Sequence, residues 1–258
     1  GSTDLTSDVI QKYVSKDRRI SFYSRPEHRI KGPKLCRNYG FEKSSGDYIL
    51  FFDSDDILLP SALSLYLSVM EVDHDAVICK TQAVNFLTGE RLHTNTIYSK
   101  NLIEDYFCFR VTFYVCGPLW SRGFLESQDV LFDEEIRYAD DWDFNLRMLY
   151  QKPKLYFLDT VLIHYRWHED SLSQQVRQLD KTEVLSDFKA RDKHLNIVKQ
   201  RSDVDLTVVY NLLSKRYKRD CKWAMQQDAK VNSLVIQKII GLELADKSCF
   251  SALRSGLG

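Results

Sequence analysis

The stretch Tyr48-Ile-Leu-Phe-Phe-Asp-Ser-Asp-Asp56 decides the fold class, because an apolar run ends abruptly in three carboxylates. Five apolar residues between Gly46 and a polar turn are typical of a buried strand. Ligands of open α/β sheets bind at the carboxyl ends of such strands. We therefore expect a ligand site at Asp53, Asp55 and Asp56.

This acidic cluster predicts a divalent metal ion. The three carboxylates are too close in sequence for all to stay ionised without a cation or dense hydrogen bonding. Hard oxygen ligands favour Mg²⁺ or Mn²⁺, and these ions also bind substrate phosphates. The simpler alternative is that one aspartate caps a helix starting near Pro60, as Asp residues often do. From these residues alone, both interpretations stand.

The segment before the strand carries a second motif. Gly32-Pro-Lys-Leu-Cys-Arg-Asn-Tyr-Gly40 contains Arg37, Asn38 and Gly40. With the acidic strand end it resembles the family 2 glycosyltransferases, in which an Arg-Asn-x-Gly helix precedes an Asp-x-Asp strand end. The resemblance spans residues 1 to about 175 and continues, in the family's order, at Phe132-Asp-Glu-Glu-Ile136, Asp140-Asp-Trp-Asp-Phe144, Tyr165-Arg-Trp-His168 and Ser171-Leu-Ser173.

The resemblance implies a GT-A fold, an α/β sandwich around a mixed sheet. The apolar periodicity agrees with an α/β layered domain. It predicts helices at residues 5–15, 32–45, 60–72 and 140–150, and strands at 19–24, 47–52, 76–86, 91–98 and 155–167, the last as one strand or two. Helical spacing places Leu63, Leu67 and Met70 on one face of their helix, and Trp142, Leu146 and Leu149 on the core face of theirs.

The pattern changes near residue 174. Residues 175–200, 204–225 and 231–244 are predicted to form successive helices rich in Lys and Arg. We expect a glycosyltransferase domain at 1–174 and a helical C-terminal extension at 175–258. Lys215-Arg-Tyr-Lys-Arg219, with Lys222 and Trp223, predicts peripheral contact with anionic lipid headgroups. The alternative is a solvated helix face.

The first residues extend the resemblance. Family members carry a segment like Asp-Asp-Gly-Ser-Thr-Asp at the end of their second strand, and this chain opens with Gly1-Ser-Thr-Asp4. We therefore expect that the strand-helix-strand unit before it is missing, together with the acidic residue that the family uses against the uracil ring. The alternative is that Gly1-Ser2 is a cloning scar.

Composition narrows the class of protein. A chain of 258 residues with 44% hydrophobic content can form one sizeable core plus an appendage. Its 36 acidic and 36 basic residues cancel, which gives no electrostatic signature of nucleic-acid binding. The six cysteines lack metal-binding spacing, and His164 with His168 lacks a third zinc ligand. Free thiols indicate a reducing compartment, so we expect a cytoplasmic protein at the inner face of the membrane.

The resemblance assigns roles to the nucleotide side of the site. It implies that Asp55 binds the metal ion, and that Asp53 faces the ribose or assists coordination. Asp56 is expected to orient its neighbours. Arg37 and Asn38 are implied to line the nucleotide pocket, and the alternative for them is a helix cap or a structural ion pair.

The resemblance also assigns the acceptor side. The family places an acidic pair at the start of a helix, with the second residue as general base, and here this pair is Asp140-Asp141. Asp141 is therefore the predicted base, with helix capping as the alternative. His168 matches a loop over the diphosphate, as a metal ligand or phosphate contact, with Arg166 beside it.

The predicted function is an inverting, metal-dependent transfer of a sugar from a nucleotide-diphosphate donor, with a UDP-sugar as first choice. The acceptor is a glycan or a lipid-linked molecule in surface polysaccharide assembly. Two alternatives remain open: a non-catalytic carbohydrate-binding or scaffold module, and a metal-dependent nucleotidyltransferase. Only a transferase releases the free nucleoside diphosphate while it extends an acceptor.

Overall fold

The computed structural model of the chain describes residues 4–26, 31–71, 73–169, 178, 180–226 and 233–242. The named helices are α1 (Thr6–Val14), α2 (Pro33–Lys43), α3 (Ala62–Val69), α4 (Leu102–Phe107), α5 (Arg122–Glu126), α6 (Asp140–Tyr150), α8 (Lys181–Val198) and α9 (Leu206–Gln226). The strands are β1 (Tyr48–Leu50), β2 (Ile57–Leu58), β3 (Ala76–Asn85), β4 (Arg91–Thr94), β5 (Pro118–Ser121) and β6 (Leu155–Trp167). Residues 233–242 are also helical.

The six strands form one mixed sheet in the order β1-β5-β3-β6-β2, with β4 paired to β3. β3 pairs in parallel with β6, and in antiparallel with β5 and β4. Since β1 is antiparallel to β5, it runs in the direction of β3 and β6. The carboxyl ends of β1, β3 and β6 therefore share one edge of the sheet, where α/β proteins bind ligands.

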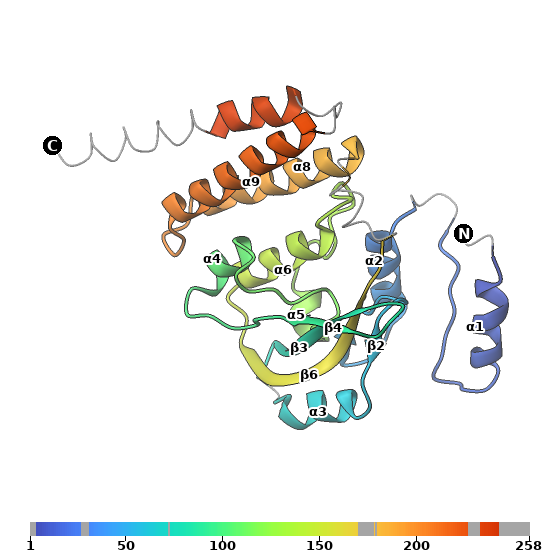
Figure 1. Cartoon of the computed structure of the whole chain (residues 1–258). Coiled ribbons are helices and arrows are strands. Elements are labelled where there is room, and N and C mark those ends of the chain that lie inside the picture. Colours follow the sequence, from blue (N-terminus) through green and yellow to red (C-terminus); the bar gives the residue numbers. More distant parts are fainter. Residues whose placement is uncertain are drawn as a thin grey trace.

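Helices cover both faces of the sheet (Figure 1). On one face, Ala62 and Tyr66 of α3 pack with Val77 and Cys79 of β3. On the other, Phe144 of α6 packs in a cluster with strand residues of β1 and β5. The layers confirm the predicted α/β class, and the buried Trp142, Leu146 and Leu149 confirm the predicted core face of α6.

The C-terminal helices share a hydrophobic core with helices of the preceding domain. One hydrophobic core contains Tyr106 of α4 and Trp142 of α6 together with Phe188 of α8 and Tyr210 of α9. Figure 1 shows these helices stacked beyond α4 and α6, on the side away from α3. The predicted boundary at residue 174 lies outside the described residues, as do Ser171-Leu-Ser173 and Gly1 to Thr3.

Two predicted strands need correction. Residues 19–24 form no strand, because none of the described strands pairs with them, and Ile20 and Tyr23 are exposed. The predicted strand at 91–98 ends at Thr94. The side-chain oxygen of Asn95 accepts the Thr81 N–H at 2.7 Å and so replaces the next backbone partner of the ladder. The turn between β3 and β4 is confirmed, with Gly89 at φ 70°.

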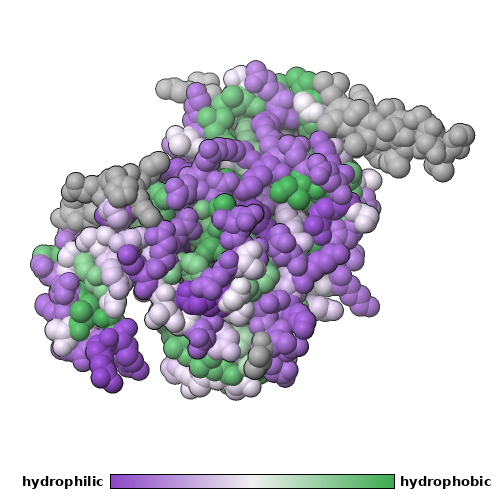
Figure 2. Space-filling view, turned by 180° about the vertical axis from the view of Figure 1, so that it is seen from behind, coloured by the Kyte–Doolittle hydropathy of each residue, from purple (hydrophilic) through white to green (hydrophobic). Residues whose placement is uncertain are grey.

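The buried face predicted for α3 is also wrong, because the face that is buried is shifted by one residue along the sequence. Leu63 and Leu67 are 52% and 53% exposed, and the buried face carries Ala62 and Tyr66. The Tyr66 hydroxyl sets this phase, because it donates to the Gly117 carbonyl at 2.7 Å inside the core. The outer face of α3 is therefore apolar, and Figure 2 shows hydrophobic surface at that lower end of the molecule.

Candidate active site

A cavity of about 1050 Å³ opens at the edge of the sheet where β1, β3 and β6 end. Its size is at the upper end of the range usual for ligand sites, roughly 300–1,000 Å³. Six of the eight predicted site residues line it: Arg37, Asp53, Asp55, Asp140, Asp141 and His168. The tertiary structure thus brings four separate sequence motifs to one cavity.

Arg37 bridges the two acidic motifs. From α2, its Nη2 donates to Asp53 Oδ1 at 2.6 Å and its Nη1 to Asp140 Oδ2 at 2.8 Å. Burial lowers the pKa of Arg37, but the carboxylates of Asp53 and Asp140 raise it by more, so the guanidinium stays charged. Arg37 therefore forms the structural ion pair that was the alternative for it, and it also lines the cavity.

Asp55 lies beside the loop that follows β6. Its Oδ2 is 3.1 Å from Nε2 of His168. Arg166 donates from Nε to the backbone carbonyl of Asp55, and its guanidinium lies 4.5 Å above the centre of the Phe86 ring. Arg166 does not itself line the cavity, so in the described structure it supports the acidic turn from behind.

Asp56 faces the interior. Its Oδ1 accepts the Arg166 N–H at 3.1 Å, and the Cys116 thiol lies 3.5 Å from its Oδ2. Burial, and then the charges of Asp55 and Asp53, raise the pKa of Asp56 to about 6. This carboxyl group joins the acidic turn to β6.

Asn38 is turned away from the cavity. Its Nδ2 donates to the Phe132 carbonyl at 2.9 Å, and its Oδ1 accepts the Phe132 N–H at 3.0 Å. Asn38 is not among the residues that line the cavity. In the described structure the Asn of the Arg-Asn-x-Gly motif ties α2 to the start of the Phe132-Asp-Glu-Glu-Ile136 segment.

The acidic pair occupies the first turn of α6. The preceding residue, Ala139, has a left-handed φ of 63° and makes no side-chain cap. Burial raises the pKa of Asp140, and the partner charge of Arg37 opposes this. Burial, and then the charge of Asp140, raise the pKa of Asp141 to about 6. The Oδ1 of Asp141 accepts the Trp142 N–H at 2.7 Å, so part of this carboxylate serves the helix start, as the capping alternative predicts.

An aromatic wall faces Asp141 and was missed in the sequence. Tyr114 and Tyr165 stack with ring centres 4.7 Å apart, and Tyr106 and Tyr138 complete the wall. Burial, and then the charge of Asp141, raise the pKa of Tyr114 to about 12, so this hydroxyl stays protonated. Tyr165 begins the quoted Tyr165-Arg-Trp-His168 segment, but no local pattern reveals the other three, because they come from separate segments that meet only in the fold.

The predicted metal ligands only partly converge. Asp55 and His168 present a carboxylate oxygen and an imidazole nitrogen to the cavity, a donor set that Mn²⁺ accepts. Asp53 is bound to Arg37 instead. The pair fits a divalent ion that takes its remaining ligands from water and substrate phosphates, as Mg²⁺ and Mn²⁺ usually do.

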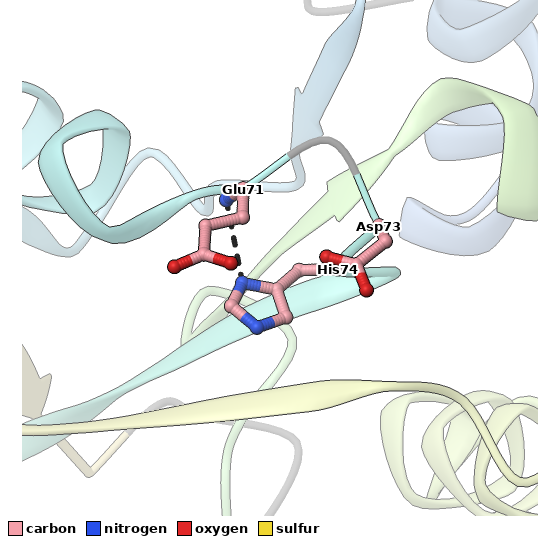
Figure 3. A group of neighbouring side chains, drawn as sticks. All are labelled: Glu71, Asp73 and His74. Atoms are coloured by element: carbon pink, nitrogen blue, oxygen red, sulfur yellow. Dashed lines mark hydrogen bonds between the residues drawn. The ribbon is translucent and has the colours of Figure 1, made fainter.

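Within the described residues, one group offers three mutually close metal-binding side chains, and it lies elsewhere. Glu71, Asp73 and His74 follow α3 at the surface (Figure 3). Two of the three side chains already have partners, since His74 Nδ1 accepts the Glu71 N–H at 3.3 Å and Lys154 lies 3.2 Å from Asp73. This group is not part of the cavity.

Comparison with known proteins gives consistent results. The family model of Glycosyl transferase family 2 matches residues 1–131. Two proteins of Bacillus subtilis (strain 168) that are named as glycosyltransferases, EpsH and EpsJ, are 25% and 28% identical, over 69% and 67% of this chain. The matches span 53% and 52% of those proteins, so the chain spans about half the length of these relatives.

The fold also matches a solved structure. The poly(ribitol-phosphate) beta-N-acetylglucosaminyltransferase TarS of Staphylococcus aureus is 24% identical over 64% of this chain and 28% of its own length. The crystal structure of S. aureus TarS 1–349 in complex with UDP superimposes with a TM-score of 0.54, at 19% identity, over 93% of this chain and 77% of that one. This likeness confirms the GT-A fold expected from the sequence.

Proposed function

The chain belongs to glycosyl transferase family 2, and from this premise we propose that it transfers a sugar from a nucleotide-diphosphate donor to a hydroxyl of an acceptor, with inversion at the anomeric carbon. One observation supports this proposal most strongly. A single cavity holds a partly exposed carboxylate-imidazole pair, Asp55 with His168, and a half-buried carboxylate, Asp141, whose pKa is raised to about 6. These are the groups that a leaving diphosphate and an attacking hydroxyl need.

We propose a UDP-sugar as the donor. Its nucleotide would lie along Arg37 and Asp53, and its diphosphate near Asp55 and His168. A bound Mn²⁺ or Mg²⁺ would be held by Asp55 and His168, and it would stabilise the negative charge that develops on the diphosphate. The UDP complex of TarS supports this choice by fold alone.

The chemistry that we assign to the chain's own residues is proton transfer. The acceptor oxygen forms a bond to the anomeric carbon as the bond from that carbon to the diphosphate breaks, and the hydroxyl proton passes to Asp141. Its Oδ2 is available for this, because the Trp142 N–H occupies Oδ1. Arg37 neutralises Asp140, so the base does not carry the full repulsion of its neighbour.

The acceptor in this proposal is a glycan or a lipid-linked molecule of a surface polysaccharide. The name of TarS, a poly(ribitol-phosphate) transferase, supports acceptors of this kind. The exposed Lys215, Lys222 and Trp223 of α9 support contact with an anionic membrane surface. No helix among the described residues combines the length and the hydrophobicity that a membrane span requires. Sedimentation with phosphatidylglycerol and phosphatidylcholine vesicles tests this contact, which should require the anionic lipid.

Product analysis tests the function. The protein is incubated with Mn²⁺ and UDP-glucose, UDP-galactose or UDP-N-acetylglucosamine, and products are separated by ion-exchange chromatography. A transferase releases UDP, at a slow basal rate when water is the acceptor. A nucleotidyltransferase releases pyrophosphate from a nucleoside triphosphate and a sugar phosphate instead. Failure to release UDP from any donor, together with failure to bind UDP, would favour the non-catalytic module.

A further inference from the structure

Arg191 reaches the cavity from a helix outside the four family motifs. It lies on α8 with only 1% of its side chain exposed, yet it lines the same cavity as Asp141. Tyr138 lies between the Arg191–Asp187 pair and the predicted base, because the charges of all three groups, Asp187, Arg191 and Asp141, act on its hydroxyl. The C-terminal helices therefore supply one wall of the site on the side of the predicted base.

One nitrogen of this guanidinium has no partner. Nε and Nη2 of Arg191 donate to the two oxygens of Asp187, at 2.9 and 3.0 Å. Nη1 is fully buried and makes no hydrogen bond in the described structure. Buried charged donors are rarely left in this state, since an unmade hydrogen bond costs the full desolvation of the group. The remaining nitrogen thus calls for an oxygen atom that none of the described residues provides.

The charges around Arg191 do not cancel. Arg216 lies 3.3 Å from Asp187 and so shares the counter-ion of Arg191. Asp220 is divided in turn between Arg216, at 3.7 Å, and Arg219, at 3.0 Å. Among the described residues, three guanidinium groups therefore share these two carboxylates. An anionic oxygen at Nη1 would balance the cluster, and guanidinium groups bind phosphate and carboxylate oxygens especially well.

Phe109 supplies an aromatic surface at the same place. It lines the cavity, is 44% exposed, and stacks on Trp142 with ring planes 7° apart. The guanidinium of Arg191 lies 5.1 Å from the centre of the Phe109 ring and 5.2 Å from that of Trp142. Phe109 also has a left-handed φ of 58°, a conformation that a bulky residue rarely adopts and that is concentrated at functional sites.

We propose that Phe109 and Arg191 form the acceptor subsite, in which a sugar unit stacks against the Phe109 ring and an anionic oxygen of that unit accepts from Nη1 of Arg191. The acceptor class is accordingly a glycan whose accepting unit carries a carboxylate or a phosphate. This inference rests on the proposed function, because Asp141 must be the base for a neighbouring hydroxyl to react. It adds that the C-terminal helices select the acceptor.

Three small probes with the same ring test the subsite. Methyl β-D-glucoside is neutral, methyl β-D-glucuronide carries a carboxylate, and methyl β-D-glucoside 6-phosphate carries a phosphate. Dissociation constants are measured by saturation-transfer NMR titration on the full chain, and UDP binding is measured separately by calorimetry. The parent should bind at least one anionic probe roughly tenfold tighter than the neutral one, the scale of one charge-assisted hydrogen bond. The anion that binds better identifies the source of the oxygen.

Two variants separate the two contacts. Arg191→Lys keeps a cation beside Asp187 but lacks the second and third nitrogens, so the anion preference should fall to about one. Phe109→Asn removes the ring and tolerates the left-handed backbone, so it should weaken all three probes alike and keep their ratio. Leu87→Asn is the control, because Leu87 lines the same cavity at 89% exposure and takes no part in the subsite.

Equal binding of the three probes by the parent would overturn the inference, and this result needs no variant to fold. An unchanged preference in a folded Arg191→Lys protein would overturn it as well. Failure of the parent to bind UDP would count against the proposed function instead. The two outcomes are distinguishable, because the probe titrations contain no nucleotide.

Discussion

The guanidinium of Arg37 donates to the carboxylate of Asp140 at 2.8 Å, across 103 positions of the sequence. This contact joins the helix that precedes the acidic strand end to the helix that carries the predicted base. Because Arg37 also binds Asp53, the donor and acceptor sides of the cavity share one cation.

Replacing Arg37 should destabilise the fold as well as the site. Arg37→Met leaves the mostly buried Asp140 without its cation, and we expect a loss of about 2 kcal/mol in the free energy of unfolding, less than for a fully buried pair because Asp53 is partly exposed. Urea denaturation measures it. Arg19→Met is the control, since Arg19 pairs with Asp17 at the surface and its loss should leave the free energy of unfolding nearly unchanged. Equal losses in both variants would contradict the bridging role.

Metal-dependent nucleotide binding should depend on Asp55. We expect Asp55→Ala to abolish the Mn²⁺-dependent part of UDP binding in calorimetry, and His168→Ala to weaken it, because each removes one potential ligand. Asp73→Ala is the matched control, taken from the acidic surface group outside the cavity (Figure 3). If Asp55→Ala binds UDP with Mn²⁺ as the parent does, the ion is held elsewhere.

Asp141 should be needed for turnover and not for nucleotide binding. Asp141→Asn should lower kcat by roughly 10²-fold or more, the scale of general base catalysis, and leave the Kd of UDP unchanged. Because the pKa of Asp141 is raised to about 6, kcat of the parent should fall below pH 6 and level off above it. A pH-rate profile that is flat between pH 5 and 8, or an Asn variant with parental turnover, would leave Asp141 as a helix-start residue.

Asp56 should make stability depend on pH. Its pKa is raised from 3.8 to about 6 on folding, so its burial favours the protonated form. The stability that this group contributes is therefore present below pH 4 and is lost as the pH rises through 6. Asp56→Asn stays neutral, so relative to the parent it should gain about 2 kcal/mol between pH 4 and pH 7. Urea denaturation at the two pH values measures the difference, and a pH-independent difference would contradict the prediction.

Replacing Asn38 distinguishes a structural role of this side chain from a nucleotide-binding role. Both hydrogen bonds of its side chain go to the backbone of Phe132, so Asn38→Ala should cost about 2 kcal/mol in the free energy of unfolding. We expect the Kd of UDP to change by less than about threefold, because the side chain does not line the cavity. A stable variant that loses UDP affinity would instead support the role implied by the family resemblance.

The fold class could be predicted from local sequence, and much of the site from the resemblance of its motifs to family 2. The apolar run of β1 ends in carboxylates, and strands alternate with amphipathic helices, so both the α/β class and the ligand edge follow from periodicity and composition. The order of the motifs predicted which residues belong to one site, and six of the eight line one cavity. For the site residues outside the acidic strand end the family resemblance was needed, because local chemistry alone left helix caps and ion pairs as alternatives.

The partners of these residues were decided only by the tertiary structure. Nothing local indicates that Asp53 pairs with Arg37 rather than with a metal ion, or that Asn38 turns toward Phe132, because each contact joins segments at least 16 positions apart. The phase of α3 was predicted wrongly for the same reason, since a hydrogen bond from Tyr66 to a distant carbonyl overrides the pattern of exposed leucines.

The contribution of α8 shows the difference most clearly. By itself the sequence predicted a helix over residues 175–200, which the structure has as α8, and the spacing of Asp187 and Arg191 allows an ordinary ion pair on one helix face. Only packing decided that this face is buried against Trp142 and Phe109, with one guanidinium nitrogen left unpaired beside the predicted base. Burial converts a common surface pair into a site, because removing water makes every unmade hydrogen bond and unbalanced charge costly.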